Sequence, residues 1–187
     1  MNKLNFLLIL TLFVSTISCS TQKTALPEDY STNPLELPLE VLSVKVIDKR
    51  STPLKAMNWD LSKIVTKKQT WVGNPPLKPI NEKDIENIIQ RASKSGGIPA
   101  NIEFRVLKGE CKVDADWKSA TEYVVFKGEL EVNIVNEKLP FTSHAEIRYE
   151  NPSRKTTEAR TLELYNLAVR NATHSILKQM KDGFEEK

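Results

Sequence analysis

The sequence predicts an α+β domain in which four mainly antiparallel strands form one sheet and two helices cover one of its faces. Four segments alternate apolar and polar residues with the period of two that is typical of a strand with one solvated face. Two other segments carry apolar stripes at three- and four-residue steps, as amphipathic helices do. The expected order is β-α-β-β-β-α, and two layers then bury every apolar face.

Length and charge limit the classes of protein that this chain fits. Its 187 residues are enough for one ordinary domain, which we place at 39–183. The 27 lysines and arginines nearly balance 24 acidic residues, so the formal net charge is +3. Phosphate binding needs a concentrated basic face, and the pattern contains none. We therefore expect no nucleic-acid partner.

The first strand is expected in 40–50, where Leu42, Val44 and Val46 alternate with polar residues. The connection that follows, 51–79, is far longer than usual. It is either a functional loop or contains a short element, for which 61–72 is the candidate as an extra hairpin arm.

The first helix is expected in 81–97, with Asn81 able to cap it and Gly96 and Gly97 able to end it. Its apolar stripe consists of Ile85, Ile88, Ile89 and Ala92.

Three more strands and a long helix are expected after this helix. The inward residues of the first of these strands are Ile102, Phe104 and Val106, continuing through Cys111, Val113, Ala115 and Trp117 after a kink or bulge at Gly109. Those of the next two are Phe126, Leu130, Val132 and Ile134, and then Phe141, Ala145, Ile147 and Tyr149. The helix is expected from Thr157 to Lys181, with a wide apolar stripe. The opposite sheet face carries charges of both signs and is expected to be solvated.

The amino terminus has the pattern of an export signal. Lys3 precedes an apolar run from Leu4 to Val14, which is too short to span a bilayer. Small polar residues follow and end at Cys19. The segment resembles a bacterial lipoprotein signal peptide, although Thr16 stands where leucine is common. The alternative is ordinary secretion with cleavage near Ser18.

That resemblance implies removal of residues 1–18 and attachment of fatty acyl chains such as palmitate to Cys19. Residues 19–38 are rich in Ser, Thr and Pro and are interpreted as a tether. Ser20, rather than aspartate, after the cysteine resembles outer-membrane sorting in enteric bacteria. The expected location is the periplasmic side of the outer membrane, with the inner membrane and the cell surface as alternatives.

The signal, the tether, a strand that ends in VKVIDKR and the element order together resemble small envelope lipoproteins. Among these are lipopolysaccharide-assembly lipoproteins, auxiliary lipoproteins of ABC-type lipid transporters and curli-type secretion lipoproteins. The resemblance covers about 40–181 and is one of fold. It implies a noncatalytic part in assembling or transporting envelope material.

No catalytic, metal or cofactor site is expected. Cys111 lies on an apolar strand face, where a free cysteine behaves as a small buried hydrophobe. His144 and His174 are thirty residues apart, without the close spacing of zinc ligands. Asp114 and Asp116 share one side of a strand and are interpreted as hydrated strand-end acids rather than cation ligands.

Trp59 and Trp71 on the long connection are the candidate partner-binding residues, because large amphipathic rings dominate binding energetics. The alternative is that they close an open end of the core. The expected function is a noncatalytic, lipid-anchored binding or assembly module of the envelope, with an envelope protein or a lipid as partner. An envelope enzyme with an unrecognised carboxylate site and a carrier of a small hydrophobic ligand are the alternatives.

Overall fold

The computed structural model describes residues 25–52, 54–57, 59, 61, 68–153 and 156–185. The signal-peptide residues 1–18 and the lipidation residue Cys19 lie outside this part of the chain and stay predictions. The elements are η1 (Tyr30–Thr32), β1 (Leu39–Asp48), β2 (Gln69–Gly73), α2 (Pro79–Arg91), β3 (Ile98–Ala115), β4 (Ala120–Ile134), β5 (Phe141–Ser153) and α3 (Glu158–Glu185).

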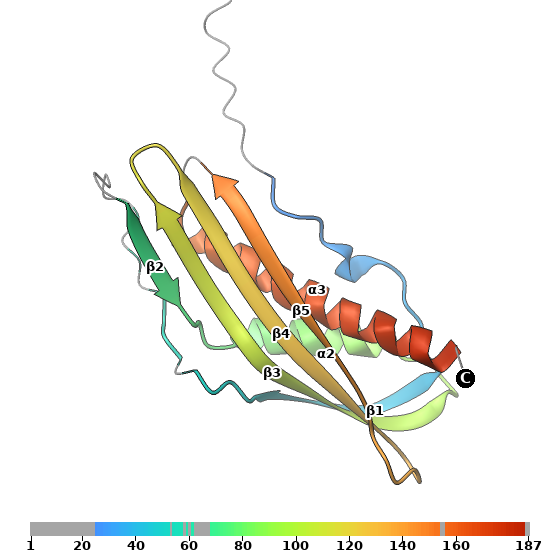
Figure 1. Cartoon of the computed structure of the whole chain (residues 1–187). Helices are drawn as coiled ribbons and strands as arrows, with labels where there is room; N and C mark the ends of the chain where they lie inside the picture. Colours follow the sequence, from blue (N-terminus) through green and yellow to red (C-terminus); the bar gives the residue numbers. More distant parts are fainter. Residues whose placement is uncertain are drawn as a thin grey trace, which may run out of the picture.

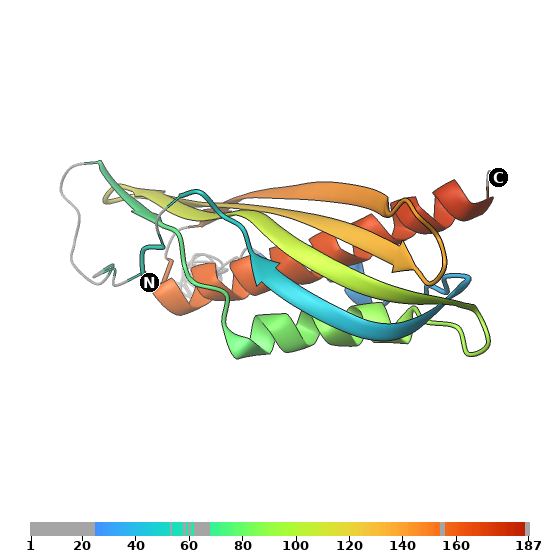
Figure 2. The ribbon, with the colours of Figure 1, turned by 90° about the horizontal axis from the view of Figure 1, so that it is seen from below.

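The α+β class with two helices on one face of a sheet is confirmed (Figures 1 and 2). The prediction of four mainly antiparallel strands is wrong, because the sheet formed by the described residues is mixed and has five strands. Its order is β1-β3-β4-β5, and β2 also pairs with β3. β1 runs parallel to β3, since the crossover through α2 returns the chain to the same end of the sheet.

β3 is long enough for two strands to share one of its edges. β1 pairs with its first half in parallel, from Leu39↔Ile98 to Asp48↔Val106. β2 pairs with its second half antiparallel, from Gln69↔Ala115 to Gly73↔Cys111. The additional strand, β2, therefore comes from the connection 51–79, which was expected to be a functional loop or to contain an extra hairpin arm.

Bulges shift the inward face of β1 and β3. The pairing of β1 with β3 skips at Leu42, which is 55% exposed rather than inward as predicted. In β3 the register shifts between Val106 and Lys108, two residues before the predicted Gly109. Trp117 is also not inward, because β3 ends at Ala115 and this residue lies in the turn to β4.

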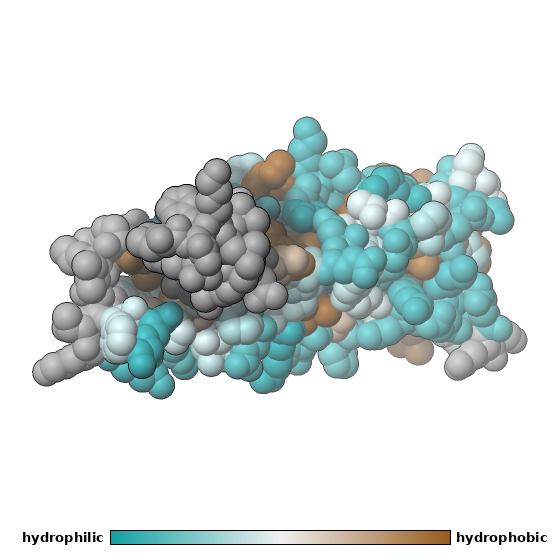
Figure 3. Space-filling view, turned by 90° about the horizontal axis from the view of Figure 1, so that it is seen from above, coloured by the Kyte–Doolittle hydropathy of each residue, from teal (hydrophilic) through white to brown (hydrophobic). Residues whose placement is uncertain are grey.

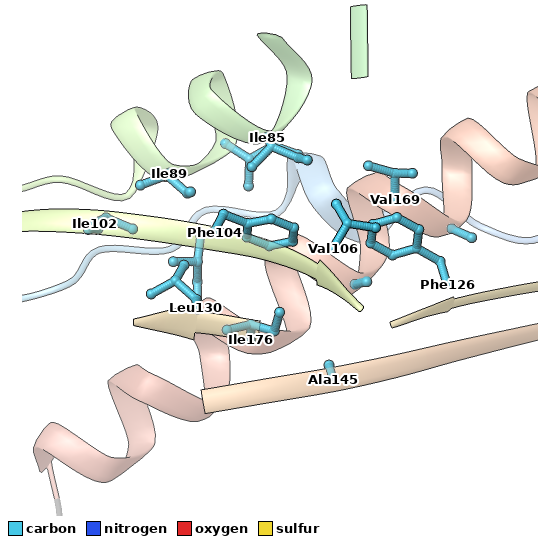
Figure 4. Close-up of a cluster of buried hydrophobic side chains, with 14 of the residues drawn as sticks. Ile85, Ile89, Ile102, Phe104, Val106, Phe126, Leu130, Ala145, Val169 and Ile176 are labelled. Atoms are coloured by element: carbon cyan, nitrogen blue, oxygen red, sulfur yellow. The ribbon is translucent and has the colours of Figure 1, made fainter. Parts of the chain in front are cut away.

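The core fills the space between the sheet and the helices (Figure 4). Phe104, Phe126, Leu130 and Ile176 are fully buried within it. A Cβ atom on Gly128 would lie 2.5 Å from Cζ of Phe104, so glycine at this position lets that ring pack across β4. The predicted apolar stripes of both helices point into this core. The helix ends differ from the prediction, because α2 ends at Arg91 rather than at residue 97, and α3 continues to Glu185 rather than Lys181.

The tether interpretation of 19–38 is wrong from residue 25 onwards, because these residues pack along α3 and α2. Leu37 is fully buried, and its backbone N–H donates to the carbonyl of Ala92 at 2.8 Å. Asn171 of α3 holds the segment by accepting from the N–H of Tyr30 at 3.2 Å and donating to the carbonyl of Glu28 at 2.9 Å. Its apolar side chains pack against the core, so this segment belongs to the folded domain although its composition is typical of a loop.

Within the described ranges, none of the helices has the length and apolarity needed to cross a bilayer.

Candidate functional site

Trp59 and Trp71 line one open hollow at the edge of the sheet, with a volume of about 630 Å³. Among the described residues, its lining consists of Leu54, Lys55, Ala56, Trp59, Thr70, Trp71 and Val72. The two tryptophans are twelve positions apart in the sequence, and the fold brings them to the same place. Apolar and aromatic walls with a few polar groups are typical of a binding site.

Local pairing places these side chains. Lys55 and Asn74 form an antiparallel bridge in which the N–H of each donates to the carbonyl of the other, at 2.9 and 3.1 Å. On β2, Trp71 pairs with Val113 of β3. A Cβ atom on Gly73 would lie 2.7 Å from Cγ of Met57, so this glycine allows the residues before Trp59 to approach β2 closely.

The two tryptophans have different surroundings. Trp59 is half-buried and packs against the core, and its backbone N–H donates to Oε2 of Glu158 at 3.0 Å. Trp71 is also half-buried but does not belong to the described core cluster. Trp59 therefore helps to close the core and also lines the hollow. Trp71 lies outside the core cluster, so it is the better probe of binding.

A second hollow, of about 410 Å³, lies between the N-terminal segment, the end of α2 and α3. Arg91, His174 and Lys181 contribute basic groups to its lining, and Nε2 of His174 lies 3.3 Å from the carbonyl oxygen of Asn33. Sequence reasoning missed this hollow, because one of its walls is the segment that was interpreted as a tether. The apolar residues Leu35 and Leu37 were the available signal.

The residues considered for catalysis are not brought together. Cys111 is buried on the inner face, and burial raises the pKa of its thiol, so the reactive thiolate is disfavoured. His144 lies exposed on the outer face, opposite Glu129. Asp114 accepts from Nζ of Lys112 at 2.8 Å and from Oγ1 of Thr70 at 2.6 Å. No group of three or more metal-ligating side chains occurs among the residues that the structure describes.

The outer face of the sheet is charged, as predicted. Arg105 forms ion pairs with Glu103 at 2.7 Å, Glu129 at 3.1 Å and Glu131 at 2.8 Å. The hydrogen bond from Arg105 lowers the pKa of Glu103. Such a network of ion pairs is typical of a solvated surface rather than of an acid–base site.

No protein-family model matches this chain, and no curated protein matches its sequence.

Proposed function

We propose that this protein is a noncatalytic, lipid-anchored module of the bacterial cell envelope that binds a protein partner in transport or secretion. The observation that carries the binding role is the hollow in which Trp59 and Trp71 meet. The resemblance of residues 1–19 to a lipoprotein signal supports the anchor, and Ser20 favours the outer membrane, facing the periplasm.

The lining of the hollow indicates the chemistry of the partner. Leu54 and Val72 are exposed apolar residues that also line the hollow, and covering them would remove apolar surface from water. Lys55 and Thr70 supply a polar rim. A partner that inserts one or two large apolar side chains and places a carbonyl or carboxylate near Lys55 satisfies both features.

Replacing Trp71 with alanine tests this role. We expect at least a tenfold loss of partner recovered from detergent-solubilised membranes, because truncating a central aromatic residue of an interface costs about 2 kcal/mol or more. The thermal midpoint should stay near that of the wild type, since Trp71 lies outside the core cluster. Leu139→Ala is the control, because it truncates an exposed apolar residue that lies outside the hollow. Equal recovery with both variants, or no specific partner at all, would contradict the binding role.

The anchor is tested separately through Cys19. Cys19→Ser is expected to lose all incorporation of labelled fatty acid and to leave the membrane fraction, because the acyl chain is attached at this thiol. Cys111→Ser is the control and should remain labelled, since this second cysteine is buried in the core. Fatty-acid labelling that persists in Cys19→Ser would show that the anchor lies elsewhere. A wild-type chain without label would favour ordinary secretion.

A further inference from the structure

The turn between β3 and β4 presents a tryptophan to solvent. Trp117 is 68% exposed, whereas Trp59 and Trp71 are half-buried. Nζ of Lys118 lies 4.4 Å from the centroid of its ring. An exposed aromatic ring of this size is costly to leave in water, and no folding role of this side chain is visible among the described residues.

The turn holds Trp117 outward in a defined conformation. Oδ1 of Asp116 accepts from the backbone N–H groups of Lys118 and Ser119, each at 2.8 Å. The N–H of Asp116 in turn donates to the carbonyl of Ser119 at 2.9 Å. The carboxylate of Asp116 is therefore bound within the turn, and these hydrogen bonds lower its pKa. The side chains of Trp117 and Lys118, which lie between Asp116 and Ser119, are exposed.

The N-terminal segment runs towards the same end of the molecule. Asn33 lies beside His174 of α3, and Glu28 lies beside Asn171, so falling residue numbers lead towards the start of α3. The base of the turn is fixed at that start, because Thr161 donates to buried Glu122 of β4 at 3.1 Å. In Figure 1 the blue start of the described chain lies in the half of the molecule that carries this turn.

Chain length then limits where a lipid on Cys19 can lie. Residue 25 is six positions after Cys19, and an extended chain of that length spans about 20 Å at most. A domain anchored by so short a segment cannot move far from the membrane. The end of the molecule that carries the turn therefore lies within reach of the lipid.

The chemistry of the tip suits the bilayer interface. Tryptophan is enriched at the level of the lipid headgroups, where its ring is buried and its indole N–H stays hydrated. Lys118 can extend its ammonium group to the headgroups while its methylenes cover the ring. Seen from above in Figure 3, the long side of the molecule is mostly hydrophilic where it is not grey, with hydrophobic residues in small separate areas. Such a surface favours contact with the bilayer through the turn at 116–119 over contact through a broad apolar face.

We infer that the turn at 116–119 is a membrane-contact site that inserts Trp117 into the interface of the bilayer holding the anchor. The contact is a second, weak attachment that fixes the orientation of the domain and turns the opposite end of the sheet away from the lipid. This inference rests on the proposed lipid anchor at Cys19.

The experiment uses the full-length, lipidated protein in vesicles of phosphatidylethanolamine and phosphatidylglycerol, 3:1, with or without brominated acyl chains that quench tryptophan fluorescence. We expect bromolipid to quench the wild type, and Trp117→Phe to lose at least half of the quenched signal. Trp71→Phe is the matched control and should keep it. Thermal midpoints of both variants should match the wild type, because each keeps an aromatic ring.

Each other outcome overturns a distinct claim. Equal quenching in the wild type and Trp117→Phe would overturn the membrane contact while leaving the anchor intact. A protein mass without acyl chains would overturn the anchor, and with it the placement of the turn. Absence of quenching, together with reduced partner recovery for Trp117→Ala from detergent-solubilised membranes, would assign the turn to a protein interface instead.

Discussion

Replacing Glu122 with alanine is expected to lower the free energy of unfolding by about 3–5 kcal/mol. The side chain is fully buried beneath the start of α3, where Thr156, Thr161, Asn151 and Arg160 all donate to its carboxylate. Truncation removes the acceptor that these four side chains share and opens a cavity. Each unsatisfied buried group adds its own desolvation cost.

Chemical denaturation of the purified variants measures this effect. Glu122→Gln should cost less than alanine, because the amide keeps the volume and one acceptor while losing the charge opposite Arg160. Glu146→Ala is the matched control, since this glutamate lies exposed on the outer face of β5 and its loss should cost less than about 1 kcal/mol. Equal stabilities of Glu122→Ala and Glu146→Ala would contradict a structural role for the buried carboxylate.

Replacing Arg50 with alanine is expected to cost about 3 kcal/mol, because its guanidinium joins three parts of the chain. The side chain is only 2% exposed and binds both carboxylate oxygens of Asp48. It also donates to the carbonyls of Pro75 at 2.9 Å and Gly109 at 3.3 Å. Arg50 thus fills the gap on the edge of β3 between the stretches that pair with β1 and β2.

The same contact has a pH signature. The hydrogen bond from Arg50 lowers the pKa of Asp48 in the folded protein. A lowered carboxyl pKa contributes stability that is fully present above the unfolded-state value of about 4 and is lost as the pH falls through the folded-state value. Stability of the wild type should therefore decline below about pH 4, and more steeply than that of Arg50→Ala.

Arg148→Ala, which removes a largely exposed arginine, is the control for the denaturation series across pH. It should keep the stability of the wild type at neutral pH within about 1 kcal/mol. If Arg50→Ala matched this control at neutral pH, or declined in acid as steeply as the wild type, the proposed role of Arg50 would be wrong.

The candidate site was only partly visible in the sequence. Large aromatic residues are unexpected in a long connection, which identifies Trp59 and Trp71 as candidates. No local pattern shows that they line the same hollow. The alternation of apolar and polar residues in β3 continues up to Trp117 and predicts an inward side chain there. The strand ends two residues earlier, and the hydrogen bonds of Asp116 form the turn that exposes it. Pattern alone does not show where a turn interrupts a strand.

Local sequence pattern predicts the α+β class, the type of most elements and the inward face of the helices and of β4 and β5. These follow from local periodicity, since a period of two or of 3.6 places apolar residues on one side whatever the rest of the chain does. Three features become visible only in the folded chain: the parallel pairing of β1, the bulge at Leu42 and the burial of Glu122. These depend on contacts between distant residues, such as Glu122 and Arg160, 38 positions apart, which no local pattern records.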